Sequence, residues 1–570
     1  MWAIYGQTLG FEFVNFDDDA HITENPHVVS GLSHDNLAWD FGIHGPSQWH
    51  PLAWLSHQTD CAVYGLNPAG HHATNVLLHT FAAMLLYLTL QRLISSWSVA
   101  AFTAAAFAVH PLNVESVAWV SERRNVLCAV FALLTVRAYV WFVSRPTLPR
   151  YAACLTAHAA ALMAKPLAVT MPCVLLLLDD WPLSRLRRAN VQAGADPGLA
   201  ATSAGPDARS ASALRLVVEK LPLLVLSFVS ALLSIFCQQA VGTVASLKMI
   251  PLSVRLTNAL AGYGWYVQKM FWPFDLAVFY PHPAILNENP WPQLVVPAIA
   301  GAVIIVLMTS VSLWQHGRRP WLFVGWFWYL GMMVPMIGIM QVGEQQEADR
   351  YAYLPMIGLF LALACAGESV AQRSRRAARG MRFVAGGLLC GWALTAGFQA
   401  AVWRNSAELF TRALEVNPRN HWAHNNLGHA LLQQGKALEA AAHFRQAIQI
   451  APTYALGHHN LGAALQEMGQ KSAARAELEI SLAYDPNSPQ TRQRLGILLL
   501  EQGQAPAAIG HLREGVRLAP DDAQAHFNLG IALAKTGQIA EALAALRQAR
   551  ALKPDWQAVA DAIRTIEASP

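Results

Sequence analysis

Long apolar stretches alternate with short polar or charged segments over the first 400 residues of the chain. Eleven of these stretches are long enough, or nearly so, to cross the apolar core of a bilayer, which takes about 20 helical residues. They cover 72–94, 97–118, 125–143, 151–164, 166–178, 221–237, 255–273, 293–315, 320–341, 351–368 and 383–402. The pattern predicts a bundle of membrane-spanning helices.

A different pattern, with a period of 34 residues, fills the chain from about residue 404 onward. The period is marked by Pro418, Pro452, Pro486, Pro520 and Pro554, and Leu-Gly pairs and alanines keep the same register between them. This spacing is typical of tetratricopeptide repeats, in which paired helices stack into a solenoid. We expect a half repeat at 406–418, four repeats at 419–554 and a capping helix at 556–568.

Composition agrees with an all-α polytopic membrane bundle followed by a helical solenoid. Apolar residues make up 54% of the chain and charged residues only 13%, which is too apolar for a soluble protein of this length. The formal net charge of +4 indicates no nucleic-acid partner, because the basic residues stand beside apolar stretches. Six of the seven cysteines fall in apolar segments, so we expect neither disulfides nor a cysteine metal site.

Three basic runs, at 185–188, 318–319 and 373–382, mark predicted cytoplasmic loops. All three share one side only if ten of the eleven stretches cross. The exception is then 255–273, which contains Arg255, Asn258, Gln268 and Lys269 and is predicted to lie at the interface or re-enter, within an outer loop 238–292. The alternative merges 151–178 into one helix, which places Arg185 outside.

This topology predicts three regions. Residues 1–70 form an outer catalytic loop with interfacial helices, 71–403 form the transmembrane domain with a cytoplasmic linker at 185–216, and 404–570 form the repeat domain outside the cytoplasm. We therefore expect an integral membrane protein of a bacterial inner membrane.

Three adjacent carboxylates, Asp17, Asp18 and Asp19, stand in the predicted outer loop. One of them could take a proton from an incoming hydroxyl while a neighbour orients it. Asp17 and Asp18 could also bind Mg²⁺ or Mn²⁺, although we expect no essential metal or other cofactor. The alternative is a solvated turn.

Cationic and polar groups at the outer ends of the spans could complete a site. Arg350, Lys165 and Arg123 are candidates for holding a lipid phosphate, because guanidinium and ammonium groups pair with phosphate oxygens. The predicted cavity lining comprises His50, His71, His72, His110, Glu115, Asp349 and Tyr351. The alternative for Arg350 is a juxtamembrane anchor, and Lys165 could extend toward the interface.

A ladder of polar side chains occupies one position of the first helix in each repeat: Asn426, Asn460, Arg494 and Asn528. An asparagine amide offers a donor and an acceptor to the main chain of an extended peptide. The ladder therefore predicts binding of acceptor proteins. A merely solvated polar face is the alternative.

Several motifs together resemble the transmembrane and tetratricopeptide repeat protein family and its bacterial relatives. They include Phe-Val-Asn-Phe-Asp17-Asp18, Met-Ala-Lys165-Pro166 and Asp349-Arg350-Tyr-Ala-Tyr-Leu-Pro, in this order ahead of the repeats. The resemblance implies a GT-C type inverting glycosyltransferase that moves a sugar, with mannose as the candidate, from a polyprenyl phosphate carrier to a Ser or Thr hydroxyl of a protein. It implies Asp17 and Asp18 as the catalytic pair and Arg350 as the phosphate ligand.

The family normally has a membrane helix before the acidic loop, whereas only sixteen residues precede Asp17 here. We expect translation to start upstream of Met1. Two other functions remain open from the sequence: a membrane-anchored repeat scaffold for envelope or secretion assembly, and a glycan polymerase or ligase.

Overall fold

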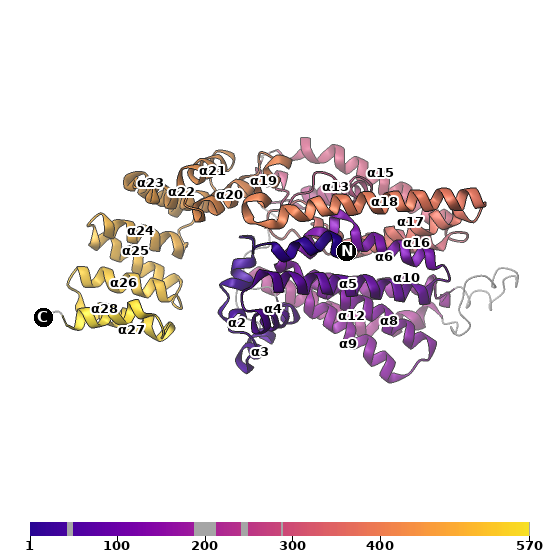
Figure 1. Ribbon diagram of the computed structural model, residues 1–570, viewed down its shortest axis with the longest axis horizontal. Coiled ribbons are helices and arrows are strands. Elements are labelled where there is room, and N and C mark those ends of the chain that lie inside the picture. Colours follow the sequence, from indigo (N-terminus) through magenta and orange to yellow (C-terminus); the bar gives the residue numbers. More distant parts are fainter. Residues whose placement is uncertain (43–48, 187–211, 241–248, 287–288, 569–570) are drawn as a thin grey trace. The chain divides into compact units, whose positions relative to one another are not determined.

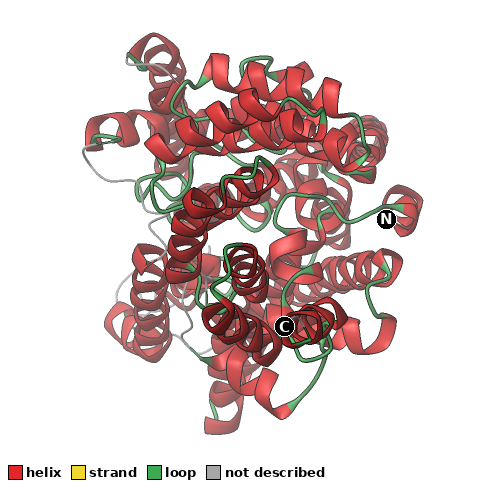
Figure 2. Cartoon of the chain, turned by 90° about the vertical axis from the view of Figure 1, so that its left-hand side faces the viewer, coloured by secondary structure: helices red, strands yellow, loops and turns green. Residues whose placement is uncertain are grey.

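The computed structural model describes residues 1–42, 49–186, 212–240, 249–286 and 289–568, and they are helical with no strand (Figure 1). In Figure 2 the described residues form helices joined by loops and turns. The chain divides into two compact units, Met1–Val416 and Asn417–Pro570. The prediction of an all-α membrane bundle followed by a repeat solenoid is confirmed.

Five helices of the first unit, among the described residues, are long and apolar enough to cross a bilayer. They are α5 (Pro68–Leu93), α8 (Arg123–Ser144), α12 (Ala213–Ala240), α15 (Trp291–Gln315) and α18 (Arg375–Ala401). A sixth crossing is possible where α6 (Trp97–Val109) meets a short helical segment ending at Ala118 (Pro111–Asn113 and α7, Val114–Ala118), with a bend of 55° at Pro111. The first unit is therefore an integral membrane domain, and the predicted ten crossings stay a prediction.

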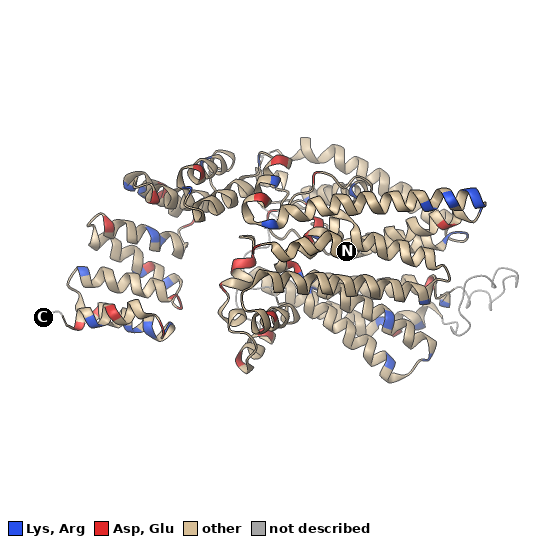
Figure 3. Cartoon of the chain, in the orientation of Figure 1, with Lys and Arg blue, Asp and Glu red and all other residues tan. Residues whose placement is uncertain are grey.

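Shorter helices fill the remaining apolar stretches: α9 (Leu148–Ala164), α10 (Met171–Asp180), α16 (Pro320–Met333) and α17 (Met356–Ala371). Figure 3 shows that charged residues are sparse along these helices, while arginines gather at the N-terminal end of α18. The predicted linker 185–216 lies largely outside the described residues. Arg185, at its start, is buried and pairs with Asp179 and Glu219 rather than lying in a flexible segment.

Lys165 interrupts the helix between α9 and α10. Its backbone is extended, and a short 3₁₀ segment from Pro166 to Thr170 follows before α10 begins. Proline has no N–H to continue the α9 ladder and disfavours a helical conformation at the preceding residue. The alternative of one continuous helix over 151–178 is therefore wrong.

The helix α13 (Leu252–Phe271) packs closely against α15, where Gly264 faces Gly301, and it also contacts loop segments. Asn258 donates to the carbonyl of Gln346, and Tyr266 donates to the carbonyl of Ala348. The carbonyl oxygen of Met270 lies 3.0 Å from Nε2 of His110. It is not among the helices apolar enough to span. The prediction that this segment lies at the interface or re-enters stays a prediction.

The repeats form regular helix pairs. They are α20 (His421–Gln433) with α21 (Ala437–Ile450), α22 (Ala455–Glu467) with α23 (Lys471–Tyr484), α24 (Pro489–Glu501) with α25 (Ala505–Leu518), and α26 (Ala523–Lys535) with α27 (Ile539–Leu552), and α28 (Gln557–Glu567) follows. The half-repeat helix α19 (Ser406–Val416) belongs to the first unit.

Glycine allows the two helices of a repeat to approach closely. A Cβ on Gly462 would lie 2.8 Å from Leu478, and one on Gly496 would lie 2.6 Å from Leu512. The turn between the helices also ends in a glycine, such as Gly469, with a positive φ of 75° that other residues adopt at a cost. The sequence period therefore reflects both helix packing and turn geometry.

Candidate active site

The acidic loop presents its first two carboxylates to different surroundings. Asp18 is buried and accepts hydrogen bonds from the backbone N–H of Val14 and of Ser121, both at 3.0 Å, and from the Ser121 hydroxyl. Burial raises the pKa of Asp18 to about 7, although these hydrogen bonds act in the opposite direction. Asp17 is exposed and has a φ of 70°, unusual for a residue other than glycine. Asp18 thus anchors the loop, while Asp17 is accessible to a reactant.

Aromatic rings and backbone bonds fix this loop to the segment that leads into α19. Phe16 stacks on Trp119 at a centroid distance of 4.5 Å, and Trp119 stacks on Trp403 at 5.8 Å. The N–H of Asn15 donates to the Ser406 hydroxyl at 2.9 Å. The acidic loop is therefore held by both the membrane bundle and the half repeat.

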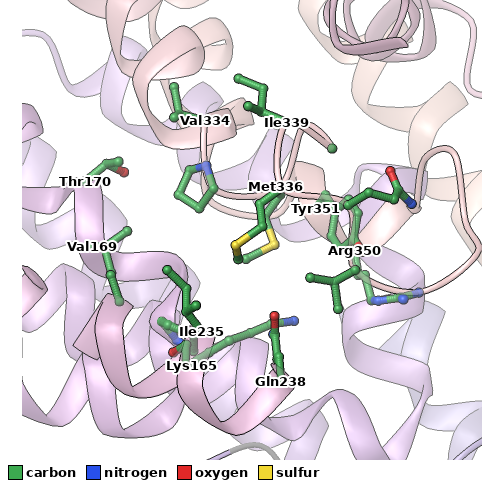
Figure 4. Close-up of a pocket in the computed structure, with 18 of the residues that line it drawn as sticks. Lys165, Val169, Thr170, Ile235, Gln238, Val334, Met336, Ile339, Arg350 and Tyr351 are labelled. Atoms are coloured by element: carbon green, nitrogen blue, oxygen red, sulfur yellow. The ribbon is translucent and has the colours of Figure 1, made fainter. Parts of the chain in front are cut away.

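A cavity of about 450 Å³ opens among α12, the segment 165–170 and the loop 334–346 (Figure 4). Its walls are mainly apolar, with contributions from Val169, Ile235, Val334, Met336, Ile339 and Met340. The polar groups gather where Lys165, Arg350, Tyr351 and Gln238 approach one another in the close-up. A cavity with apolar walls and cationic groups at one end can bind an anion that carries a hydrocarbon chain.

Three cations converge on Glu122, which is fully buried at that end of the cavity. Lys165 Nζ lies 2.9 Å from one carboxylate oxygen, and Arg124 lies 2.7 Å from the other. The Arg350 Nε lies 3.5 Å from the same oxygen as Arg124. All four of these residues line the cavity.

Arg350 is positioned by a second carboxylate. Its backbone N–H donates to Glu115 at 2.7 Å, and its Nη1 donates to the other oxygen of the same group at 2.5 Å. The guanidinium also lies over the rings of Trp119, at 5.4 Å, and Tyr351, at 5.2 Å. Such two-sided contact leaves little freedom in its orientation.

Two histidines lie near the charged groups of this site. Burial lowers the pKa of His21, which the negative charge of Asp17 raises and the positive charge of Arg124 lowers. Burial likewise lowers the pKa of His50, which lines the cavity and senses the charges of Arg124 and Lys165. Burial therefore favours the neutral form of both imidazoles.

Among the residues predicted for a lipid phosphate, Arg350 and Lys165 line the cavity, whereas Arg123 does not. Arg123 is completely buried, forms an ion pair with Asp60 at 2.5 Å and donates to Asn75 at 2.8 Å and to the carbonyl of His71 at 2.7 Å. These partners occupy its guanidinium and join α4 (Pro51–Tyr64), α5 and α8. Its neighbour Arg124 points to the cavity instead.

Of the predicted lining residues, His50 and Tyr351 line the cavity. Glu115 does not line it but accepts a hydrogen bond from the guanidinium of Arg350. The others are packed elsewhere: His71 lies 3.0 Å from the Gly65 carbonyl, His72 lies 3.4 Å from the Glu12 carbonyl, His110 lies 3.0 Å from the Met270 carbonyl, and Asp349 accepts from Tyr280 at 3.0 Å. These four hold the surrounding helices and loops together.

Three participants were missing from the predicted set: Glu122, Arg124 and Ser121. Their signal in the sequence was the run Ser-Glu-Arg-Arg, which passes from a 3₁₀ segment (Val120–Glu122) into α8. No group of three or more His, Cys, Asp or Glu suited to a metal occurs in the part of the chain that the structure describes. The absence of an essential metal stays a prediction.

The polar ladder of the repeats is partly engaged within the array. Asn460 donates to Asn425 of the preceding repeat at 2.9 Å, and Asn426 donates to the Trp422 carbonyl at 3.1 Å. Arg494 lies 3.5 Å from Gln466. Asn528 is buried and accepts from Gln524 at 2.9 Å. Acceptor binding by this ladder stays a prediction.

Comparison with known proteins covers both parts of the chain. Models described as tetratricopeptide repeat match residues 459–519, 493–555 and 409–442, and one described as TPR repeat matches 429–469. The C-terminal region is a tetratricopeptide repeat array.

Relatives with a named activity are protein O-mannosyl-transferases. Tmtc1 of Drosophila melanogaster is 31% identical over 209 residues, which are 35% of this chain and 24% of that protein. Tmtc2 of the same organism is 35% identical over 197 residues, 31% of this chain and 20% of that protein. The chain therefore aligns with less than a quarter of the length of these relatives.

A longer alignment joins the two parts. Tmtc3 of Drosophila melanogaster is 24% identical over 495 residues, which are 75% of this chain and 51% of that protein. The repeat array alone is too short to supply this coverage, so the similarity extends into the membrane domain. Among solved structures, the repeat protein YrrB covers 28% of this chain and 84% of its own, with 23% identity and a TM-score of 0.26. The chain is thus similar to the transmembrane and tetratricopeptide repeat proteins.

Proposed function

We propose that the chain is a GT-C type glycosyltransferase that moves a sugar from a polyprenyl-phosphate donor to a Ser or Thr hydroxyl of a protein. The observation that carries this proposal is the apolar cavity in which three cations surround Glu122, whose neighbour Ser121 bonds to Asp18 of the acidic loop. The names of the relatives support mannose as the sugar and protein as the acceptor. The repeats bind the acceptor protein, and the membrane is a bacterial inner membrane with the repeats outside the cytoplasm.

The charge of the cavity matches the donor. With all groups ionised, Arg124, Lys165 and Arg350 exceed Glu115 and Glu122 by one positive charge. A sugar linked through a lipid phosphodiester carries one negative charge, which gives initial attraction. The released lipid phosphate is a monoester with a charge of about −1.5 to −2 at pH 7. The cations therefore bind the product anion, and the transition state leading to it, more strongly than the donor.

The chemical step exchanges one bond for another. The acceptor oxygen bonds to C1 of the sugar as the bond from C1 to the phosphate oxygen breaks, and the electron pair of the broken bond stays on the lipid phosphate. The hydroxyl proton passes to the carboxylate of Asp17. Attack opposite the leaving phosphate inverts the configuration at C1.

Asp17 and Asp18 have different roles in this proposal. Both oxygens of Asp18 accept hydrogen bonds from Val14 and Ser121, so Asp18 positions the loop. Asp17 is exposed and acts as the general base. A positioned base contributes typically 10² to 10⁴-fold to the rate.

The test compares Asp17→Asn with Asp19→Asn in full-length protein reconstituted with a polyprenyl-phosphate mannose donor. Mass spectrometry of envelope proteins as acceptors measures sugar transfer. We expect Asp17→Asn to lose at least about 10²-fold of the rate and Asp19→Asn to retain it. Equal rates of sugar transfer by native protein and Asp17→Asn would show that Asp17 is not the general base.

A further inference from the structure

A second cavity, of about 920 Å³, lies between α5, α8 and α9, away from the candidate active site. On α8 its lining residues run from Phe131 to Ser144, whereas Arg124 of the active site stands at the beginning of that helix. The thirteen residues from Arg124 to Arg137 correspond to about 20 Å along a helix. The two cavities are therefore separate.

The lining combines cationic and hydroxyl groups without a carboxylate. Arg92 of α5 and Arg137 of α8 contribute guanidinium groups, and Thr89 and Thr156 contribute hydroxyls. Within the described residues, the Nη1 of Arg137 and the hydroxyl of Thr89 are buried and have no hydrogen-bond partner. In the part of the chain that the structure describes, neither Arg92 nor Arg137 forms an ion pair. Unpaired buried donors are costly, so this arrangement favours occupation by an anion.

The remaining walls suit a hydrocarbon chain. Phe131, Leu134 and Trp141 provide large apolar surfaces, and Ala153 and Ala157 of α9 leave space between the helices. All three helices belong to the membrane domain. A small hydrophilic anion would leave most of this lining uncovered, whereas a lipid would cover it.

The lining at Trp141 and Ser144, near the C-terminal end of α8, has further features of a membrane interface. The guanidinium of Arg150 lies 4.6 Å from the ring centroid of Trp141, donates to the Trp141 carbonyl at 3.0 Å and donates to the Ser144 hydroxyl at 3.1 Å. Tryptophan and arginine are enriched where a helix passes from hydrocarbon to headgroups. This end of α8 is predicted to face the cytoplasm, where leaflets are rich in anionic lipid.

We infer that this cavity binds an anionic glycerophospholipid, with its phosphate between Arg92 and Arg137 and an acyl chain against the alanines of α9. The inference does not depend on glycosyl transfer, because none of these residues lines the active-site cavity. It assigns a lipid of the surrounding bilayer, rather than the sugar donor, to this end of the bundle.

The experiment uses full-length protein in phosphatidylcholine nanodiscs with an increasing fraction of phosphatidylglycerol. Native mass spectrometry measures retained lipid, and thermal unfolding measures Tm. We expect native protein to retain phosphatidylglycerol over phosphatidylcholine with a rise in Tm. Arg137→Gln should weaken this binding about tenfold, as expected for loss of a charge-assisted hydrogen bond.

Two further variants keep the test informative if Arg137→Gln does not fold. Arg92→Gln changes an exposed residue, and Ala157→Leu fills the cavity without a change of charge; both should reduce lipid retention. Arg376→Gln, exposed on α18, is the matched control and should retain it. Equal retention in native protein, Arg92→Gln and Ala157→Leu would overturn the inference.

Competition distinguishes the source of the anion. Glycerol phosphate alone should give little stabilisation, because it cannot cover the apolar walls. If it stabilises native protein as much as phosphatidylglycerol does, the cavity is a site for soluble phosphates and the lipid assignment is wrong. Displacement of phosphatidylglycerol by equimolar polyprenyl phosphate would also overturn the assignment, because the cavity would then belong to the donor pathway.

Discussion

Glu122 is the residue on which the cations of the candidate active site depend. It is fully buried and holds Lys165 at 2.9 Å and Arg124 at 2.7 Å. Removal of one partner from a buried ion pair leaves an uncompensated charge and costs about 3–5 kcal/mol. We therefore expect Glu122→Gln to lower the stability of the membrane domain by this amount, measured by thermal unfolding in lipid nanodiscs. The exposed Glu415→Gln, whose ion pair with Arg412 lies at the surface, should cost less than about 1 kcal/mol.

Glu347 predicts a pH dependence of stability. Burial raises its pKa from the ordinary 4.5 to about 8, partly offset by the charge of Lys269. The folded protein therefore binds more protons than the unfolded chain between these values, so this group makes stability fall as pH rises from about 4.5 to about 8. Glu347→Gln should reduce that fall in Tm and be more stable than native protein at pH 8.5.

The matched control for this titration is Glu12→Gln, because the side chain of Glu12 is exposed. It should leave the dependence of Tm on pH unchanged. An unchanged slope in Glu347→Gln, with the control behaving as expected, would show that Glu347 is not the titrating group.

Adjacent residues show where prediction from sequence ends. Arg123 and Arg124 are identical in type, yet one pairs with Asp60 in the helical packing and the other pairs with Glu122 at the cavity. Successive helical residues point about 100° apart, so the rotation of α8 decides their roles. That rotation follows from tertiary packing. The same applies to Asp17 and Asp18. Both are aspartates, and the positive φ of Asp17, rather than side-chain chemistry, gives them different surroundings.

Contact between α13 and α15 depends on two glycines. A Cβ on Gly264 would lie 2.8 Å from the Cα of Gly301, and a Cβ on Gly301 would overlap the carbonyl oxygen of Leu260. Gly301→Ala should therefore force the helices apart and destabilise the domain by about 1–3 kcal/mol, measured by thermal unfolding. Gly391→Ala on α18 has open space around it and should be neutral or stabilise by up to about 1 kcal/mol. Equal Tm values for the two variants would contradict this close packing.

Helices with local signals were the most predictable elements. The 34-residue ladder marked every repeat, because each turn requires its glycine and each helix pair its small residues. Pro166 marked the break after Lys165. The bend at Pro111 was less evident, since the apolar run continues through it from 97 to 118. Composition alone cannot distinguish one straight helix from two that meet at an angle.

At the scale of the whole molecule, the active-site cavity and the acidic loop both lie within the first unit. All lining residues fall between His50 and Tyr351, and the unit extends to Val416. The acidic loop also requires the start of the half repeat, because Phe16 contacts Phe410 and Asn15 bonds to Ser406. A shortened chain that keeps the acidic loop intact should therefore end at Val416 rather than at the end of α18.

This division gives a test that separates donor chemistry from acceptor binding. We expect a chain ending at Val416 to bind polyprenyl-phosphate mannose as tightly as the full-length protein and to glycosylate a short Ser/Thr peptide at high concentration. It should lose most transfer to folded acceptor proteins, because the repeats proposed to bind them are absent. A chain ending at Val402 lacks Trp403 and the contacts of Phe410 and Ser406, so it should lose peptide glycosylation as well. If the chain ending at Val416 modifies protein acceptors at the full-length rate, the repeats do not deliver the acceptor, and transfer to a lipid-linked glycan becomes the reaction to measure in its place.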